Sequence, residues 1–215
     1  MARTATTAKA AVRRRLTVAQ RRQELLDLGL EAFGQQGYDD VSVEDIAARA
    51  GISTGLLYHY FPSKKAYFLA VLQAAIAQIY QATTPVTDVP REAALTDAVA
   101  AYLRHAEAHP QGFLTAHRSA MSSDPDVQQL VRRARERQLE RILADVAPSE
   151  PAADPVRLAA VGWIAMVYEV TATWLATRVP DADAVAEMLV AALSAATATG
   201  VNDVARHHEG APGRI

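Results

Sequence analysis

The stretch VSVEDIAARAGISTGLLYHYFPSK, residues 41–64, has the most specific pattern in this chain. Ser42 and Ser53 each precede a short helical pattern, where a serine hydroxyl can cap free backbone N–H groups. Gly51 lies between the two patterns, and glycine tolerates the positive φ that a tight turn requires. Two short capped helices joined in this way predict a helix-turn-helix motif that spans about Ser42 to Phe61.

Helical periodicity continues along the chain, and no segment alternates apolar and polar residues for long enough to form a sheet. Thr17 and Gln20 form a capping-box pattern before a first helix, which we expect Gly34 and Gly37 to stop. Prolines and capping residues divide the remaining chain. The expected helices are 18–35, 43–50, 54–60, 64–82, 91–108, 113–121, 125–146, 154–178 and 183–199. The sequence therefore predicts an all-α protein with a three-helix N-terminal head and a C-terminal helical bundle body, about nine helices together.

These helices suggest four parts of the chain. We expect a flexible basic arm at 1–16, a helix-turn-helix domain at 17–63, a larger helical domain at 64–199 and a flexible tail at 200–215. The net charge is only −2, yet residues 1–22 carry seven Lys/Arg side chains and no acidic one. Such an arm suits a polyanion such as DNA. The alternative is a solvated tail without a partner.

The composition narrows the classes of protein that fit. Half of the 215 residues are apolar and none is cysteine, so a packed core is expected without disulfides or thiolate chemistry. No uncharged apolar run approaches the ~18 residues of a membrane span, and the start lacks a secretory pattern, so we expect a cytoplasmic protein without membrane contact. Phosphate-binding glycine loops and HExxH are missing, so we expect no catalytic site and no cofactor.

The motifs AFGQQGYDDVSVEDIAARAGIS and TGLLYHYFPSKKAYFLAV extend the helix-turn-helix pattern on both sides. Through them, residues 22–69, about a quarter of the chain, resemble the DNA-binding head of the TetR/AcrR family of regulators. The resemblance implies a nine-helix fold, dimerisation through the last two helices and a ligand cavity in the body. We therefore expect a transcriptional regulator that binds a palindromic DNA operator as a homodimer. Repression in response to a small-molecule effector is the family's usual mode.

Carried over position by position, the resemblance makes the segment 54–60 the recognition helix in the major groove. Hydroxyl and imidazole groups there can bond base edges, and tyrosines can reach phosphates. The residues expected to contact DNA are Ser42, Ser53, Thr54, Gly55, Leu56, Tyr58, His59, Tyr60 and Lys64. Leu57 and Phe61 should face the head's own core. Alternatively, Ser42 only caps its helix, Tyr58 and Tyr60 fill the core, and Lys64 is an ordinary exposed lysine.

An effector cavity in the body would use aromatic and polar side chains between the fifth and eighth helices. The candidate lining residues are Tyr102, Phe113, His117, Met121, Trp163, Met166, Tyr168, Glu169 and Trp174. Each has core packing as its alternative, or an interhelical salt bridge with an arginine in the case of Glu169. We interpret the charged run RRARERQLER, 132–141, as a solvated helix face. His105 and His109 have metal-ligand spacing without a third defined ligand, so we predict no metal site.

The last two helices contain VGWIAMVYEVTATWLA, 161–176, and AVAEMLVAALSAATA, 184–198. Small and apolar residues of this kind can pack closely across a two-fold axis, and one small head reads too few base pairs to be selective alone. A buried intramolecular hairpin is the alternative. Two other functions remain open: a helical DNA-binding or adaptor protein without ligand sensing, and a helical enzyme. A body cavity of several hundred Å³ would favour the ligand-gated regulator, and a body without a cavity would favour the adaptor.

Overall fold

The structure is a computed structural model that describes residues 16–84, 91–119, 122–146 and 154–209. Within these ranges all secondary structure is helical, which confirms the all-α prediction. The helices are α1 (Val18–Gln35), α2 (Val43–Ala50), α3 (Thr54–Tyr60), α4 (Lys64–Ala82), α5 (Arg91–Ala108), α6 (Pro110–Ser119), α7 (Pro125–Val146), α8 (Asp154–Thr177) and α9 (Ala182–Glu209).

The helices α1, α2 and α3 form the head around one apolar cluster. Leu25 of α1, Ile46 of α2 and Leu57 of α3 are almost completely buried in it. The capping box at the start of α1 is present, because Thr17 Oγ1 accepts from the backbone N–H of Gln20 at 3.2 Å and the Gln20 side chain accepts from the Thr17 N–H at 3.0 Å. The capping interactions and the burial of all three helices in one apolar cluster together stabilise the head.

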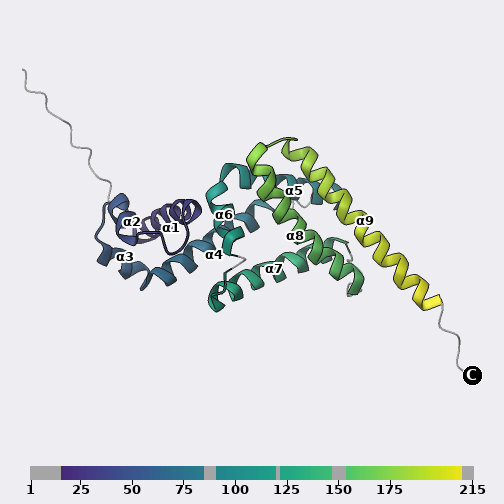
Figure 1. Ribbon diagram of the computed structural model, residues 1–215, viewed down its shortest axis with the longest axis horizontal. Coiled ribbons are helices and arrows are strands. Elements are labelled where there is room, and N and C mark those ends of the chain that lie inside the picture. Colours follow the sequence, from purple (N-terminus) through teal and green to yellow (C-terminus); the bar gives the residue numbers. More distant parts are fainter. Residues whose placement is uncertain (1–15, 85–90, 120–121, 147–153, 210–215) are drawn as a thin grey trace, which may run out of the picture.

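Helix α4 connects the head to the body (Figure 1). Its first half completes the head core, where Tyr67 and Val71 are fully buried. The Tyr67 hydroxyl donates to the carbonyl of Leu25 in α1. Its second half reaches the body, where Ile79 packs on the body core. One continuous helix therefore takes part in both cores.

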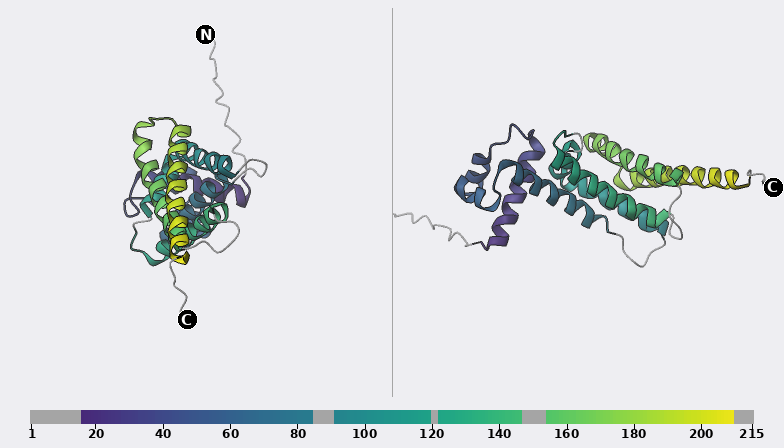
Figure 2. Two further views of the ribbon diagram at one scale, coloured as in Figure 1. Left: turned by 90° about the vertical axis from the view of Figure 1, so that its right-hand side faces the viewer. Right: turned by 90° about the horizontal axis from the view of Figure 1, so that it is seen from below.

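The body consists of α5 to α9 around a second apolar cluster. Leu103, Phe113, Trp163 and Leu189 are buried there, and the indole Nε1 of Trp163 donates to the carbonyl of Leu189 at 2.6 Å. Figure 2 shows the elongated molecule, with the head at one end and α9 extending beyond the body at the other. The helix-turn-helix motif and the body core are thus well separated along the molecule.

Two helix boundaries differ from the sequence prediction by more than two residues. Helix α6 begins at Pro110, three residues earlier than expected, because proline suits the first turn of a helix as well as it ends a preceding one. Helix α9 runs to Glu209, so residues 200–209 are helical and were wrongly assigned to a flexible tail. Extending an existing helix costs far less than starting one, so a single glycine did not stop it. Residues 1–15 of the arm expected at 1–16, and residues 210–215 of the expected tail, lie outside the described residues.

Gly34 has a different role from the helix stop that the sequence suggested. It lies inside α1, which ends at Gln35, and is buried. A Cβ at this position would clash with Cα and Cβ of Gln111 in α6. Gly34 therefore allows the backbones of α1 and α6, one in the head and one in the body, to approach closely.

Helix α8 is long and apolar enough to cross a membrane by length and composition alone. In the structure it packs between α7 and α9, and Trp163 and Trp174 enter the body core. Only 28% of its most apolar 18-residue stretch is buried inside the protein, however. Much of the apolar surface of α8 is therefore open in a single chain.

Candidate DNA-binding surface and body cavities

The turn between α2 and α3 has the geometry that its sequence predicts. Ser42 Oγ accepts from the backbone N–H of Asp45 at 3.0 Å and caps α2. Gly51 follows α2 with φ 62° and ψ 40°, in the left-handed region. Ser53 Oγ then accepts from the N–H of Leu56 at 3.2 Å and caps α3. The two helices and their turn therefore form a helix-turn-helix unit.

One face of α3 enters the head core and the other faces solvent. Leu57 and the following Phe61 are buried, which confirms their predicted core role. Leu56 and Tyr58 are 40% and 37% exposed, and Gly55 and His59 are also exposed. Large side chains on the outer face of this short helix are therefore accessible to a partner.

The other predicted DNA-contacting residues lie around this surface and also have structural contacts. Ser42 and Ser53 act as caps. Thr54 is half-buried, and Tyr60 packs against the head cluster with its ring centroid 6.0 Å from that of His59. Apart from Lys64, the predicted residues therefore all belong to the α2–α3 unit or directly cap its helices.

Lys64, at the start of α4, is not an ordinary exposed lysine. Its Nζ donates to the carbonyl of Asp39 at 3.0 Å and lies 5.0 Å from the centre of the Tyr38 ring. These contacts hold the ammonium group beside the loop between α1 and α2. Arg22, which the sequence indicated only as one of the basic side chains of residues 1–22, is an exposed residue of α1 whose guanidinium lies 5.2 Å from the Phe61 ring centre and adds a positive charge near α3.

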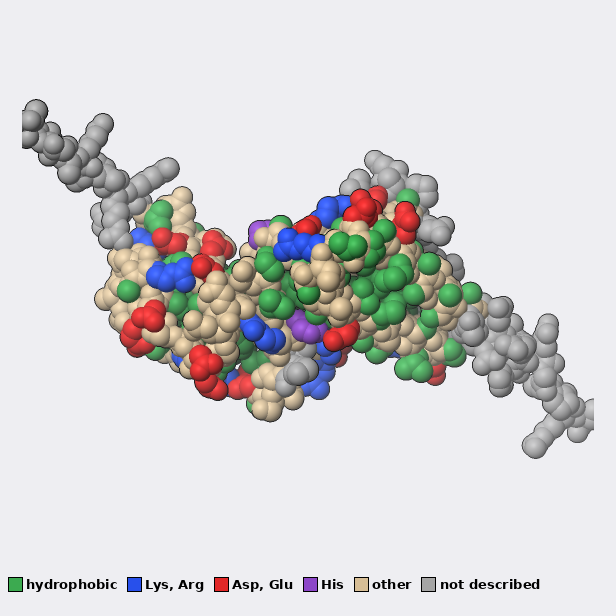
Figure 3. Space-filling view, turned by 45° about the horizontal axis from the view of Figure 1, so that its top comes forward, with side chains coloured by type: hydrophobic (Ala, Val, Ile, Leu, Met, Phe, Trp, Pro, Cys, Tyr) green, Lys and Arg blue, Asp and Glu red, His purple; other side chains and the backbone are tan. Residues whose placement is uncertain are grey.

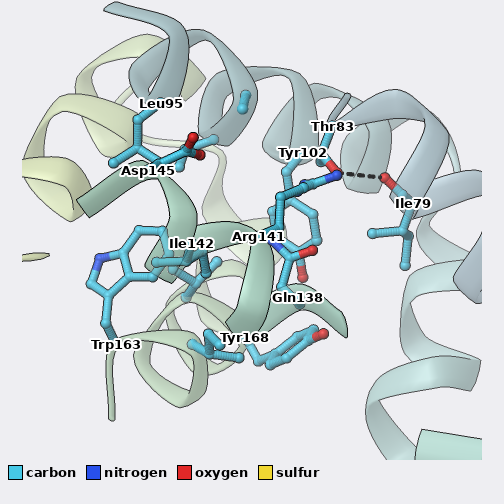
Figure 4. A pocket seen from close by; sticks show the side chains of 14 residues that line it. Ile79, Thr83, Leu95, Tyr102, Gln138, Arg141, Ile142, Asp145, Trp163 and Tyr168 are labelled. Atoms are coloured by element: carbon cyan, nitrogen blue, oxygen red, sulfur yellow. Dashed lines mark hydrogen bonds between the residues drawn. The ribbon is translucent and has the colours of Figure 1, made fainter. Parts of the chain in front are cut away.

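The body contains a small cavity between α4, α5, α7 and α8 (Figure 4). Its volume is about 60 Å³, and mostly apolar side chains line it. Tyr102 is 7% exposed, and its hydroxyl makes no hydrogen bond of good geometry among the described residues, although the Thr171 side chain of α8 lies close enough to interact with it. Burial, and next the nearby Tyr168, raise the pKa of Tyr102 well above its usual value. A buried donor without a well-formed hydrogen bond is costly, so this hydroxyl is available to a ligand or a water molecule.

A second cavity of about 50 Å³ adjoins the first. The two share Ile79, Gln138 and Tyr168 as lining residues. The second cavity continues between α4, α6 and α7 as far as His117. Two larger hollows are open surface features: a head–body crevice of about 580 Å³ and a groove of about 460 Å³ between α7 and α8.

The structure gathers part of the predicted effector site. Tyr102, Trp163 and Tyr168 line the first cavity, and His117 and Tyr168 line the second. Phe113 lies behind them, buried in the core with its ring stacked on His117 at 5.8 Å. These five residues form one region of the body, on three neighbouring helices.

The remaining predicted effector residues lie outside both cavities. The Trp174 Nε1 donates to the carbonyl of Pro180 at 2.7 Å and holds the α8–α9 turn, and Met166 packs on the body core. Glu169 lies 3.8 Å from His117 Nε2, so its partner is a histidine rather than the arginine that we considered. Met121 lies outside the described residues.

Sequence reasoning missed the polar side of the first cavity, which α7 and the end of α4 provide. Arg141 lines the cavity, and its guanidinium donates to Thr83 Oγ1 at 2.6 Å and to the Tyr80 carbonyl at 3.4 Å. The run 132–141 is therefore not a solvated face throughout, because its last residue turns toward α4. The spacing of Gln138, Ile142 and Asp145 along α7 was the available signal.

His105 and His109 have ring centroids 4.7 Å apart. Burial, and next His109, lower the pKa of His105, which favours the neutral imidazole. Across the part of the chain that the structure describes, no group of three or more potential metal ligands occurs. The two imidazole rings therefore contact each other where α5 ends and α6 begins.

A helix-turn-helix head joined by one helix to an all-α body defines a class of DNA-binding regulators. Residues 25–71 match the model of the family described as "Bacterial regulatory proteins, tetR family". Residues 90–196 match the model of the family described as "Tetracyclin repressor-like, C-terminal domain". The HTH-type transcriptional activator FasR of Mycolicibacterium smegmatis is 31% identical over 179 residues, which cover 80% of this chain and 81% of FasR. The chain belongs to the TetR family of transcriptional regulators.

Solved structures agree with this assignment. A tetR-family regulator from Streptomyces coelicolor has a TM-score of 0.74 and 28% identity, with 86% of this chain and 83% of that chain covered. A TetR-like regulator from Rhodococcus sp. RHA1 has a TM-score of 0.70 and 26% identity, with 83% and 96% covered. The chain is thus a DNA-binding transcriptional regulator, and these relatives bear the names of regulators rather than enzymes.

Proposed function

We propose that this regulator is a ligand-responsive repressor that binds a palindromic operator as a homodimer. The observation that carries the DNA-binding part is the outer face of α3, where Leu56, Tyr58 and His59 are exposed on a capped, core-anchored helix. We propose a cytoplasmic location because a regulator of this kind works on chromosomal DNA. We propose no catalytic activity.

The DNA-binding proposal is tested with DNA from the gene's own flanking regions in a fluorescence-anisotropy titration at several salt concentrations. His59→Ala removes a base-edge donor and should weaken binding to the preferred sequence about tenfold. Lys64→Ala should weaken binding to all sequences and flatten the salt dependence. Arg157→Ala, an exposed α8 residue in the body, serves as the control. Equal binding of wild type to operator and random DNA would overturn the proposal.

The dimer proposal rests on exposed apolar side chains of the last two helices. Leu158 and Val161 of α8 are 73% and 48% exposed, and Met188 of α9 is 53% exposed. Figure 3 shows hydrophobic side chains gathered over the part of the body where these helices lie. Exposed apolar surface of this extent favours association. A two-fold dimer would also bring two heads to two half-sites, about 34 Å apart.

Ligand gating is supported by the buried Tyr102 hydroxyl inside the body, which makes no hydrogen bond of good geometry among the described residues. The two cavities, of about 60 and 50 Å³, are smaller than a drug-sized ligand needs, which is about 300 Å³ or more. This closed state favours the alternative, a DNA-binding protein without ligand sensing. Under the gating proposal a ligand selects a more open conformer and changes the spacing of the heads. Candidate effectors can be screened for a shift of the thermal midpoint, with DNA affinity measured in parallel. An effector that changes both supports ligand gating, whereas no such effector is expected for a DNA-binding protein without ligand sensing.

The sign of regulation requires its own measurement. Repression is the mode that the family resemblance implied, whereas the Mycolicibacterium smegmatis relative is named an activator. A reporter gene behind the operator-containing promoter, with and without this regulator, decides between them. Repression predicts lower reporter output when the regulator is present. Higher output would make the chain an activator and leave its DNA-binding role intact.

A further inference from the structure

The charges around the two body cavities are predominantly positive. Arg141 lines the first cavity, and the exposed side chains of Arg135 and Arg137 line the second. Asp145 lines the first cavity, and the second has no acidic lining residue in the described part of the chain. None of the three arginines has an ion pair with a carboxylate among the described residues. A site of this composition favours an anionic group over a cationic one.

Most other lining side chains are apolar, and the two cavities are neighbours. Ile79, Gln138 and Tyr168 separate them, so movement of these three side chains would join the cavities into one elongated space. The joined space would extend from Leu95 at one end to His117 at the other. Its shape and lining fit a chain-like apolar molecule better than a compact polar one.

The polar groups of the first cavity meet around Arg141. Figure 4 shows Arg141, Tyr102 and Gln138 close together, whereas Asp145 lies beside Leu95, away from them. An anionic group at Arg141 would thus have the Tyr102 hydroxyl nearby as a second donor, in competition with Thr171, at a distance from the one carboxylate. A guanidinium and a buried hydroxyl together suit a carboxylate or phosphate oxygen.

In the closed state, Arg141 is bound to the C-terminal end of α4. It donates to Thr83 Oγ1 and to the Tyr80 carbonyl, and its guanidinium lies 4.8 Å from the centre of the Tyr80 ring. These partners are neutral groups at the negative end of a helix dipole. A carboxylate forms a stronger, charge-assisted bond with arginine, so an anionic ligand would compete with the end of α4.

We propose that the effector is an elongated amphiphile with an apolar chain and an anionic end, and that Arg141 binds this end and releases α4. The proposal rests on the ligand-responsive function proposed above and names its ligand class. Helix α4 follows the recognition unit closely, since only three residues lie between the end of α3 at Tyr60 and the start of α4 at Lys64. Freeing its far end changes the position of the head, and DNA affinity falls because the two heads no longer fit their half-sites.

The test uses three probes with the same chain: dodecanoate, dodecanol and dodecyltrimethylammonium, each below its critical micelle concentration. Trp163 lines the first cavity, and the chain has two tryptophans, so a Trp174→Phe background makes Trp163 the single reporter. We expect saturable quenching or a spectral shift with dodecanoate and at least about tenfold weaker binding of the other two probes. Equal binding of the ammonium probe, or no binding of any probe, would overturn the ligand class.

Arg141→Gln tests the proposed residue. Its affinity for dodecanoate should fall about tenfold, Arg141→Lys should recover part of it, and Arg157→Gln on α8 should match wild type. Saturating dodecanoate should weaken operator binding of wild type about tenfold and leave Arg141→Gln nearly unchanged. Dodecanoate binding that is equal in wild type and folded Arg141→Gln would remove Arg141 from the site. Because fluorescence is read without DNA, failure of operator binding is a separate result.

Discussion

Gly51 has the strictest backbone requirement in the head. At its φ of 62°, in the left-handed region, the Cβ of any other residue would lie too close to a backbone carbonyl oxygen. Gly51→Ala should therefore lower the free energy of unfolding by about 1 kcal/mol, which corresponds to a thermal midpoint about 3 °C lower. Thermal unfolding followed by circular dichroism measures this change.

Gly55→Ala is the matched control for this prediction. Gly55 lies in α3, and a Cβ there would meet only Ser53 Oγ, at 3.9 Å. Alanine is the better helix former, so the variant should unfold at the same or a slightly higher temperature than wild type. If both variants lost the same stability, the left-handed turn would not be the cause.

At the scale of elements, the contact between α1 and α6 determines how the head meets the body. Arg118 of α6 donates to the carbonyls of Phe33 and Gly34 near the end of α1. Gly34→Ala would force these helices apart at Gln111 and should cost about 1–3 kcal/mol. Gly112→Ala, whose Cβ would lie 3.7 Å from Leu30, should be much milder. Urea unfolding compares the two, and equal losses would contradict the close-approach role.

Lys65 of α4 and the start of α7 form a second connection between head and body. Lys65 Nζ lies 2.9 Å from Asp124 and 2.6 Å from Asp126. The bond from Lys65 lowers the pKa of Asp124, and the backbone N–H groups of Val127 and Asp126 act in the same direction. Because this pKa is lower in the folded chain, the stabilisation is complete above the unfolded pKa of about 4 and disappears as pH falls through the folded value.

Asp124→Asn should therefore have a lower thermal midpoint than wild type at pH 7, and the difference should shrink toward pH 3. Asparagine can still cap α7, so the change isolates the charge. Thermal scans between pH 7 and pH 3 measure the difference. Asp97→Asn, on exposed α5 surface, is the control. A difference that stays constant with pH would show that the cap, and not the ion pair with Lys65, accounts for the loss.

At the scale of the whole molecule, the exposed faces of α8 and α9 predict a dimer. Val161→Glu combined with Met188→Glu places two charges on this surface without touching the buried core. Light scattering should then report a monomer, and operator affinity should fall by about a hundredfold, because the two heads no longer bind as one unit. Ala108→Glu, on exposed α5 surface, should remain a dimer. A wild-type monomer that binds the operator tightly would contradict the dimer proposal.

The sequence by itself determined the helices and the head. Capping residues, prolines and Gly51 act over a few neighbouring residues, so their effects can be read locally, and the predicted boundaries of α1 to α5 agree with the structure. The same locality made the exposed face of α3 and the core roles of Leu57 and Phe61 predictable.

The body site was decided only by the tertiary structure. Whether Tyr102 has a partner, whether Trp174 lines a cavity or holds a turn, and whether Arg141 faces solvent or α4 all depend on helices far apart in the sequence. A helical period shows which residues share a face, but the choice of packing partner comes from burial and shape summed over the whole core. For that reason the tertiary structure, rather than the sequence, revealed the cationic cavities and the role proposed for Arg141.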